Sequence, residues 1–170
     1  MTRPFTALFA DRDGSAAVEM ALVLPFLLVL MCGAVEAGNY FLSEHAVDKA
    51  VRDAARYAAR LPMTDYTGCS VPSAGAAEQQ TQRVARFGDP DGTGNARLVG
   101  WTADSMTTVT IACDDTSSYG TAGLYTDFPN GAPVVTVSAS VPYKTFFGVL
   151  GLGAATLNLN AQSQAAVIGA

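Results

Sequence analysis

The stretch Gly14 to Val35, which reads GSAAVEMALVLPFLLVLMCGAV, decides the fold. Between Ser15 and Val35 the only charged side chain is that of Glu19. A helix of about 20 apolar residues crosses the roughly 30 Å hydrocarbon core of a bilayer. We therefore predict a transmembrane helix over 15–35. Its second turn carries the carboxylate of Glu19. A lone charge inside the membrane costs roughly 2.5–3.5 kcal/mol on insertion scales, so we expect this carboxylate to have a partner.

Pro25 lies inside this predicted helix. Its ring nitrogen has no proton to donate to the carbonyl of Ala21, so the sequence predicts a kink or a local loosening of the helix at this point.

The helix is expected to continue past the membrane to Leu61, since the next helix breaker is Pro62. Small and apolar residues recur at spacings of three and four and predict a packing face, covered by the protein's own core or by another subunit: Val47, Ala50, Val51, Ala54, Ala58 and Leu61. Acidic and then basic residues follow another face at i,i+4 steps, an order that suits pairing and the helix dipole: Glu44, Asp48, Arg52, Arg56 and Arg60.

The remainder, 62–170, reads as one modest α+β domain. A short helix over 76–87, four strands and a short apolar run are predicted, the strands at 97–101, 106–113, 134–143 and 156–168 and the run at 144–152. The expected fold class is therefore α+β, with a long N-terminal helix packed on a C-terminal antiparallel β-sheet. The net charge of −5 and the pI near 4.6 argue against a nucleic-acid partner.

Three cysteines are present. Cys32 lies in the apolar run, which leaves Cys69 and Cys113 for the domain. If the domain is exported, these two can form a disulfide that stabilises the fold by ~4 kcal/mol in the chain-entropy model. If it is not exported, both stay as thiols.

A turn-rich loop follows the predicted short helix. Oxygen-bearing side chains alternate in it like the first half of a calcium loop: Asp89, Asp91, Thr93 and Asn95. The glutamate that a calcium loop needs at its twelfth position is replaced by Gly100. A solvated Asx-type turn is therefore the main expectation, and a calcium site is the weaker alternative.

Catalytic motifs are missing from the sequence. His45 is its only histidine, so no Ser-His-Asp or Cys-His set can form. The sequence contains no CxxC, HExxH or P-loop motif and no GxGxxG in a strand–turn–helix setting. We expect no enzyme activity, no cofactor and no metal. An exported hydrolase would need a pair among carboxylates such as Asp104, Asp114, Asp115 and Asp127.

Three processing routes fit the N-terminus. A secretory signal could be cut after Ala37, although the apolar run is longer than the usual ~7–15 residues. A lipoprotein cut at Cys32 would want a small residue where Met31 stands. A cut after Gly14 would instead keep the helix and leave Ser15 as the new N-terminus, with Glu19 fifth in the mature chain.

The run from Gly14 to Pro25, GSAAVEMALVLP, resembles the N-terminus of the TadE-like pilus-assembly proteins, which are minor pseudopilins of the tight-adherence (Tad/Flp) type IV pilus system. The resemblance covers about Asp11 to Arg60. It implies that 1–14 is a leader which prepilin peptidase removes after Gly14, and that Glu19 assists subunit assembly. Met20 replaces the tyrosine common in major Flp pilins, which favours a minor pseudopilin.

The resemblance also implies a type IV pilin-like fold, a place in the bacterial inner membrane and three kinds of partner: prepilin peptidase, other pilins or pseudopilins, and the Tad inner-membrane assembly platform. The domain 62–170 would lie outside the cytoplasm, in the periplasm or on the pilus. The alternative is an adhesin-like binding module on a simple signal anchor, with the aromatic loop 119–128 as its ligand site.

Overall fold

The computed structural model describes residues 14–66, 69, 76–114, 123–126, 128, 131–149 and 157–169. The chain divides into two compact units, Met1–Asn39 and Tyr40–Ala170. The predicted leader, apart from Gly14, lies outside the described residues. The elements are the helices α1 (Ser15–Ala58), α2 (Ala76–Phe87) and α3 (Phe146–Val149), the strands β1 (Thr107–Asp114), β2 (Ala132–Pro142) and β3 (Asn158–Ala166), and the short 3-10 helices η2 (Met63–Tyr66) and η3 (Asp104–Met106).

Helix α1 begins at Ser15, as predicted, and ends three residues before the predicted Leu61. The amide of Arg60 bonds the carbonyl of Tyr57, and the amide of Leu61 bonds that of Ala58. These i→i+3 bonds tighten the last turn, a common way to satisfy the carbonyls at a helix end. The helix therefore closes just before Pro62.

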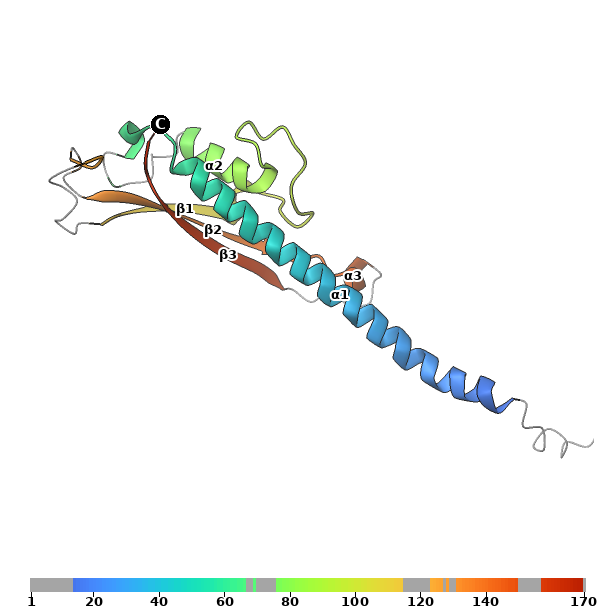
Figure 1. The fold of residues 1–170 in the computed structure, drawn as a ribbon. Coiled ribbons are helices and arrows are strands. Elements are labelled where there is room, and N and C mark those ends of the chain that lie inside the picture. Colours follow the sequence, from blue (N-terminus) through green and yellow to red (C-terminus); the bar gives the residue numbers. More distant parts are fainter. Residues whose placement is uncertain are drawn as a thin grey trace, which may run out of the picture. The chain divides into compact units, whose positions relative to one another are not determined.

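The three strands form one antiparallel sheet in the order β1-β2-β3. Three of the four predicted strands are confirmed, with ends that differ by one or two residues, and the helix predicted over 76–87 matches α2. The apolar run after β2 contains the short helix α3. Figure 1 shows the second half of α1, from Tyr40, and α2 lying over the sheet. The fold class is confirmed as α+β, with a long N-terminal helix packed on a three-stranded antiparallel sheet.

One core joins the second half of α1 to the sheet. The predicted helix face is buried, with Val51 and Ala54 at 0% exposure and Leu61 partly buried. Alternate residues of β2, among them Val135 and Val137, lie in the same cluster. The alanines of α1 and the branched side chains of the sheet lie in this one cluster. The face predicted from periodicity is thus covered by the protein's own core.

The strand predicted at 97–101 is wrong. This segment is a turn, because the amide of Trp101 bonds the carbonyl of Leu98 at 3.0 Å. The amide of Arg97 bonds the carbonyl of Arg86 at 2.8 Å, which ties the turn to α2 rather than to a strand. Trp101 is 1% exposed. Trp101 fills the core and Leu98 packs against it, whereas Val99 is exposed, so the β propensity of the segment was overridden by packing.

Gly100 makes this turn possible. A Cβ at Gly100 would lie 2.0 Å from the carbonyl oxygen of Pro142, a backbone atom that cannot move aside alone. We expect Gly100→Ala to lower the free energy of unfolding by about 1–3 kcal/mol, the usual cost of overpacking. Denaturant unfolding measures this change. The matched control is Gly94→Ala, whose Cβ would meet its nearest atom at 3.6 Å. Equal stability of the two variants would contradict the turn as described.

Candidate membrane and assembly segment

The first unit contains an apolar helix with almost no protein around it. Residues 15–31 of α1 are all exposed, as is Gly14 before them. Leu22, Phe26 and Leu30 are 66%, 73% and 70% exposed. An 18-residue window of α1 has a mean hydropathy of 2.4, and none of it is buried. A helix that is apolar all round needs lipid or other helices to cover it, so this segment has the length and composition of a single-pass membrane anchor.

The start of the helix is well defined. The carbonyl of Gly14 accepts a hydrogen bond from the amide of Val18 at 3.1 Å, the first bond of α1. The amide of Ser15 is among the donors that have no partner within a helix. A cut between Gly14 and Ser15 would place a positive α-amine where the helix dipole is also positive. Such an amine is stabilised by a nearby carboxylate.

Glu19 is the carboxylate nearest to this position along the described helix. It is four residues past Ser15 and is exposed, on the same helix face one turn further along. It is therefore free to face a group on a neighbouring helix. Its role remains a prediction. Helix α1 continues through Pro25, and the kink predicted there also stays a prediction.

Gly14 has no role in packing within the described structure. A Cβ at Gly14 would meet nothing within 4 Å, and the same holds for Gly33 and Gly38 further along α1. None of the three has a positive φ. Any requirement for glycine at position 14 would therefore come from a partner, such as an enzyme that reads the N-terminus.

In the second unit, Cys69 and Cys113 form a disulfide, with Cα atoms 5.7 Å apart. It joins the segment after η2 to the end of β1. Beside it, the hydroxyl of Tyr66 donates to the carbonyl of Ala58 at 2.6 Å. Burial, with a smaller contribution from the charge of Asp65, raises the pKa of Tyr66 to about 12. Cys32 is unpaired.

The loop proposed as a weak calcium candidate forms a local turn. The Asp89 carboxylate accepts hydrogen bonds from the hydroxyl of Thr93 at 2.7 Å and from its amide at 3.2 Å. These bonds, the hydroxyl bond first, lower the pKa of Asp89. Among the described residues, no group of three or more His, Cys, Asp or Glu side chains could hold a metal ion. The loop matches the Asx-type turn that we favoured from the sequence.

Of the four carboxylates considered for a hydrolase, the structure describes only the side chain of Asp104. Asp104 pairs with Arg86 at 3.0 Å, while Asp115 and Asp127 and the side chain of Asp114 lie outside the described residues. Of the aromatic loop 119–128, Tyr119 also lies outside them. The hydroxyl of Tyr125 donates to the carbonyl of Val167 at 2.7 Å. Phe128 is 8% exposed. These two aromatic residues stabilise the fold rather than present a platform to a ligand.

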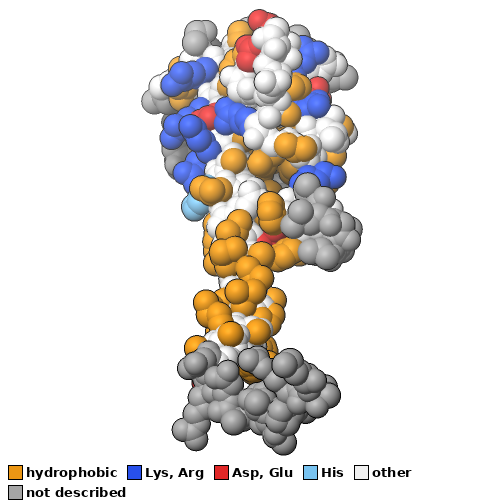
Figure 2. Space-filling view, turned by 90° about the vertical axis from the view of Figure 1, so that its right-hand side faces the viewer, with side chains coloured by type: hydrophobic (Ala, Val, Ile, Leu, Met, Phe, Trp, Pro, Cys, Tyr) orange, Lys and Arg blue, Asp and Glu red, His pale blue; other side chains and the backbone are white. Residues whose placement is uncertain are grey.

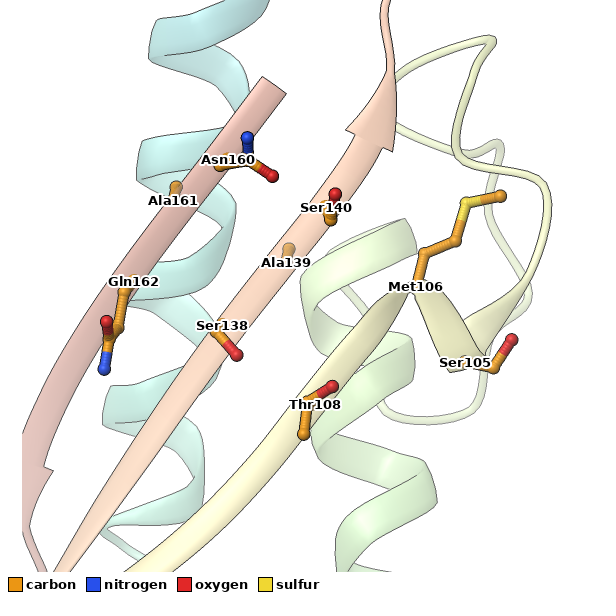
Figure 3. Close-up of a pocket in the computed structure, with 9 residues that line it drawn as sticks. All are labelled: Ser105, Met106, Thr108, Ser138, Ala139, Ser140, Asn160, Ala161 and Gln162. Carbon is orange, nitrogen blue, oxygen red and sulfur yellow. The ribbon is translucent and has the colours of Figure 1, made fainter. Parts of the chain in front are cut away.

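A shallow groove on the outer face of the sheet, away from the core, was not predicted from the sequence. Its volume is about 680 Å³. Figure 3 shows Ser138 and Ser140 of β2 between Thr108 of β1 and the amides of Asn160 and Gln162 of β3. The alternation of small polar residues in the strands was the signal for this face. The groove offers hydroxyl and amide groups and no charge.

Residues 14–56 match the model of a family described as TadE-like protein. The match begins at Gly14 and covers the exposed apolar segment and most of the packed part of α1. No curated protein and no solved structure matches the chain.

Proposed function

We propose a role in pilus assembly for this chain because its residues 14–56 match the model of the TadE-like protein family, which is associated with assembly of the Tad pilus. Members of the family are generally structural proteins without enzyme activity. The finer proposal is that the chain is a minor pseudopilin that assists the assembly or initiation of a Tad/Flp-type pilus. The observation that supports it most is the exposed apolar helix that starts at Gly14 and carries Glu19 in its second turn.

In this proposal prepilin peptidase cuts the bond between Gly14 and Ser15. The bond lies at the start of α1. Of its two polar groups, the Gly14 carbonyl accepts a helical hydrogen bond, whereas the Ser15 amide has no partner within the helix. Opening one turn of a helix end is inexpensive compared with opening its interior, because the terminal amides have no partners within the helix. The peptidase can thus reach the bond without disturbing the rest of the anchor.

Glu19 then pairs with the new α-amine of Ser15 on a neighbouring subunit. The pair removes two opposite charges from the apolar environment, where each alone would be costly. It also fixes the axial register between neighbouring helices, because only one relative height brings the two groups together. This explains a carboxylate on an otherwise apolar surface.

We place the protein in the bacterial inner membrane as a single-pass protein, with the second unit outside the cytoplasm. The Cys69–Cys113 disulfide supports this orientation, because disulfides persist in oxidising compartments and are rare in the cytosol. The proposed partners are prepilin peptidase, other pilins or pseudopilins, and the Tad assembly platform.

Counting thiols tests the proposed orientation. We expect a thiol reagent, added to the denatured but unreduced chain from cells, to modify one cysteine, Cys32, and to modify three after reduction. Mass spectrometry reads the number of adducts. The Cys69→Ser variant is the control and should show two thiols without reduction, at Cys32 and Cys113. Three thiols in the unreduced wild-type chain would place the domain in the reducing cytosol and contradict the proposal.

The groove on the sheet favours a second candidate function, an adhesin-like binding module on a signal anchor. Its hydroxyl and amide lining suits an uncharged ligand rich in hydroxyl groups, such as a glycan. Glycan-array binding that is lost in Gln162→Ala would favour this function, particularly if Gly14 could be replaced without consequence. A mature chain cut after Gly14 would favour the pseudopilin.

A further inference from the structure

Exposed apolar side chains of the second unit gather at one end of it. Those that the structure describes at this end, which we call the apolar end, are Phe41, Leu42, Val99, Phe146 and Leu157. Their exposed fractions run from 43% to 85%. Figure 2 shows hydrophobic side chains gathered beside the pale blue histidine, which is His45 of α1, one turn past Phe41. A contiguous apolar surface of this kind marks a site of interaction.

Tyr143, the first residue after β2, joins three segments at the apolar end. Its ring packs edge-on against that of Tyr40 in α1, with the centroids 5.3 Å apart, and Tyr40 in turn contacts Phe41 at 5.9 Å. The amide of Tyr143 bonds the carbonyl of Leu157, just before β3, at 2.8 Å. The exposed side chains of α1 and of the residues before β3 therefore belong to one surface.

Two further segments reach the same end. The turn at 97–101 lies against the end of β2, where a Cβ on Gly100 would come within 2.0 Å of the carbonyl oxygen of Pro142. Val99, the neighbour of Gly100, is 85% exposed. Helix α3 begins at Phe146, four residues after Pro142. Lys144, between β2 and α3, is exposed and adds a cation to the apolar end.

The aromatic residues set this end apart from the rest of the unit. Among the described aromatic side chains of the second unit, Phe41 and Phe146 are exposed and the others are buried or half-buried. Tyr66 and Phe128, for example, are 2% and 8% exposed. Aromatic rings beside a lysine, on an apolar surface, are the composition that proteins place at the interface between membrane and water.

The short connection to the anchor favours lipid as the partner. The proposed span ends at Val35, and Phe41 is 41 − 35 = 6 residues further along the chain. Six residues rise about 9 Å as a helix and reach at most about 22 Å when fully extended. The headgroup region itself extends roughly 5–7 Å beyond the hydrocarbon core on each side. The chain therefore keeps the apolar end within reach of the headgroups at all times, whereas a protein partner would first have to arrive.

We propose that the apolar end of the second unit lies on the membrane that holds α1, with the rings of Phe41 and Phe146 among the headgroups and Lys144 at the lipid phosphates. Aromatic rings bury their apolar body at this level, and the lysine ammonium is attracted to anionic lipid. This inference rests on the membrane placement in the proposed function. It adds a lipid contact made by the domain itself, which must break when the chain leaves the membrane for a pilus.

Quenching of tryptophan fluorescence by spin-labelled lipid tests the proposal. The full chain is placed in vesicles of phosphatidylethanolamine and phosphatidylglycerol that carry the label on a fraction of the headgroups. Trp101, the only tryptophan of the chain, is buried and gives the baseline. Phe146→Trp should add fluorescence that the headgroup label quenches. Leu157→Trp is the second reporter in case Phe146→Trp disturbs the fold, and it should be quenched in the same way.

Ile168→Trp is the matched control, because Ile168 is 54% exposed and lies at the other end of the unit. Its amide bonds the carbonyl of Ala59, which is 59 − 40 = 19 residues along the chain from Tyr40. This separation is about 28 Å of helical rise, so the headgroup label should not quench Ile168→Trp.

The charge of Lys144 can be tested in the same assay. Lys144→Gln, combined with Phe146→Trp, should lower the ratio of docked to undocked chains about fivefold, the weight of one cation at an anionic surface. In vesicles of phosphatidylcholine alone, which carry no net charge, Lys144→Gln should make no difference. A loss of the same size in both kinds of vesicle would overturn the proposed contact between Lys144 and anionic lipid.

Equal quenching of Phe146→Trp and Ile168→Trp would overturn the proposal. Leu27→Trp, in the exposed apolar part of α1, separates this failure from failure of the membrane placement. A label deep in the acyl chains should quench Leu27→Trp whether or not the domain docks, and an unquenched Leu27→Trp would overturn both. If Phe146→Trp were shielded from aqueous acrylamide only at many copies per vesicle, and not quenched by labelled lipid, a second copy rather than lipid would cover the apolar end.

Discussion

Glu19→Ala should leave the chain cut and membrane-bound but should reduce its entry into pili at least about tenfold. Without the carboxylate, the α-amine of Ser15 would enter the apolar stack unpaired, at a cost of roughly 2.5–3.5 kcal/mol on insertion scales. Each 1.4 kcal/mol corresponds to a factor of ten in an equilibrium, so a tenfold loss is a lower bound. Quantitative blotting of sheared pili and of membranes from the same cells measures both quantities.

Two further variants separate charge from size. Glu19→Gln keeps the length of the side chain but removes its charge, and should behave like the alanine variant. Val18→Ala changes an exposed neighbour, 62% exposed in the same helical turn, and should assemble normally. Normal piliation with Glu19→Ala would contradict the proposed pairing of Glu19 with the Ser15 amine.

Gly14→Leu should abolish the cut while leaving the fold and membrane insertion intact. The structure offers open space at this position, since a Cβ there would meet nothing within 4 Å. A steric requirement for glycine must therefore arise in the peptidase. Gly33→Ala and Gly38→Ala are matched controls in the same helix, where a Cβ also meets nothing within 4 Å. Both should be cut normally, and the apparent mass of the chain on a gel distinguishes the cut from the uncut form.

If Gly14→Leu were cut and assembled like the wild type, glycine would have no processing role. The signal-anchored binding module would then be the better account. A variant that failed to accumulate at all would be compared with Gly33→Ala and Gly38→Ala in membrane fractions, which shows whether insertion rather than cutting was lost.

The helical part of the fold could be predicted closely from the sequence. Periodicity and the stop at Pro62 place α1 within three residues, because both are local signals. The three strands could be predicted from the alternation of apolar and polar residues and from the turn residues between them. The segment 97–101 could not be read in this way, since its turn depends on the approach of Gly100 to Pro142, a residue 42 positions away (142 − 100). Local sequence patterns do not reveal contacts between residues so far apart along the chain.

The charged face of α1 shows the same limit. The i,i+4 order of acids and cations suggested pairing along the helix, and Asp48 with Arg52 follows that pattern. Asp53 instead pairs with Arg97 from the distant turn, which leaves the later arginines without a partner among the described carboxylates.

The intact mass of the mature chain, purified from its native membrane, tests the central claim most directly. Removal of residues 1–14 leaves 170 − 14 = 156 residues beginning at Ser15, and this is the mass that the account predicts. A chain of 170 − 37 = 133 residues beginning after Ala37 would show an ordinary secretory signal. The mature protein would then lack the membrane helix, which would contradict the account.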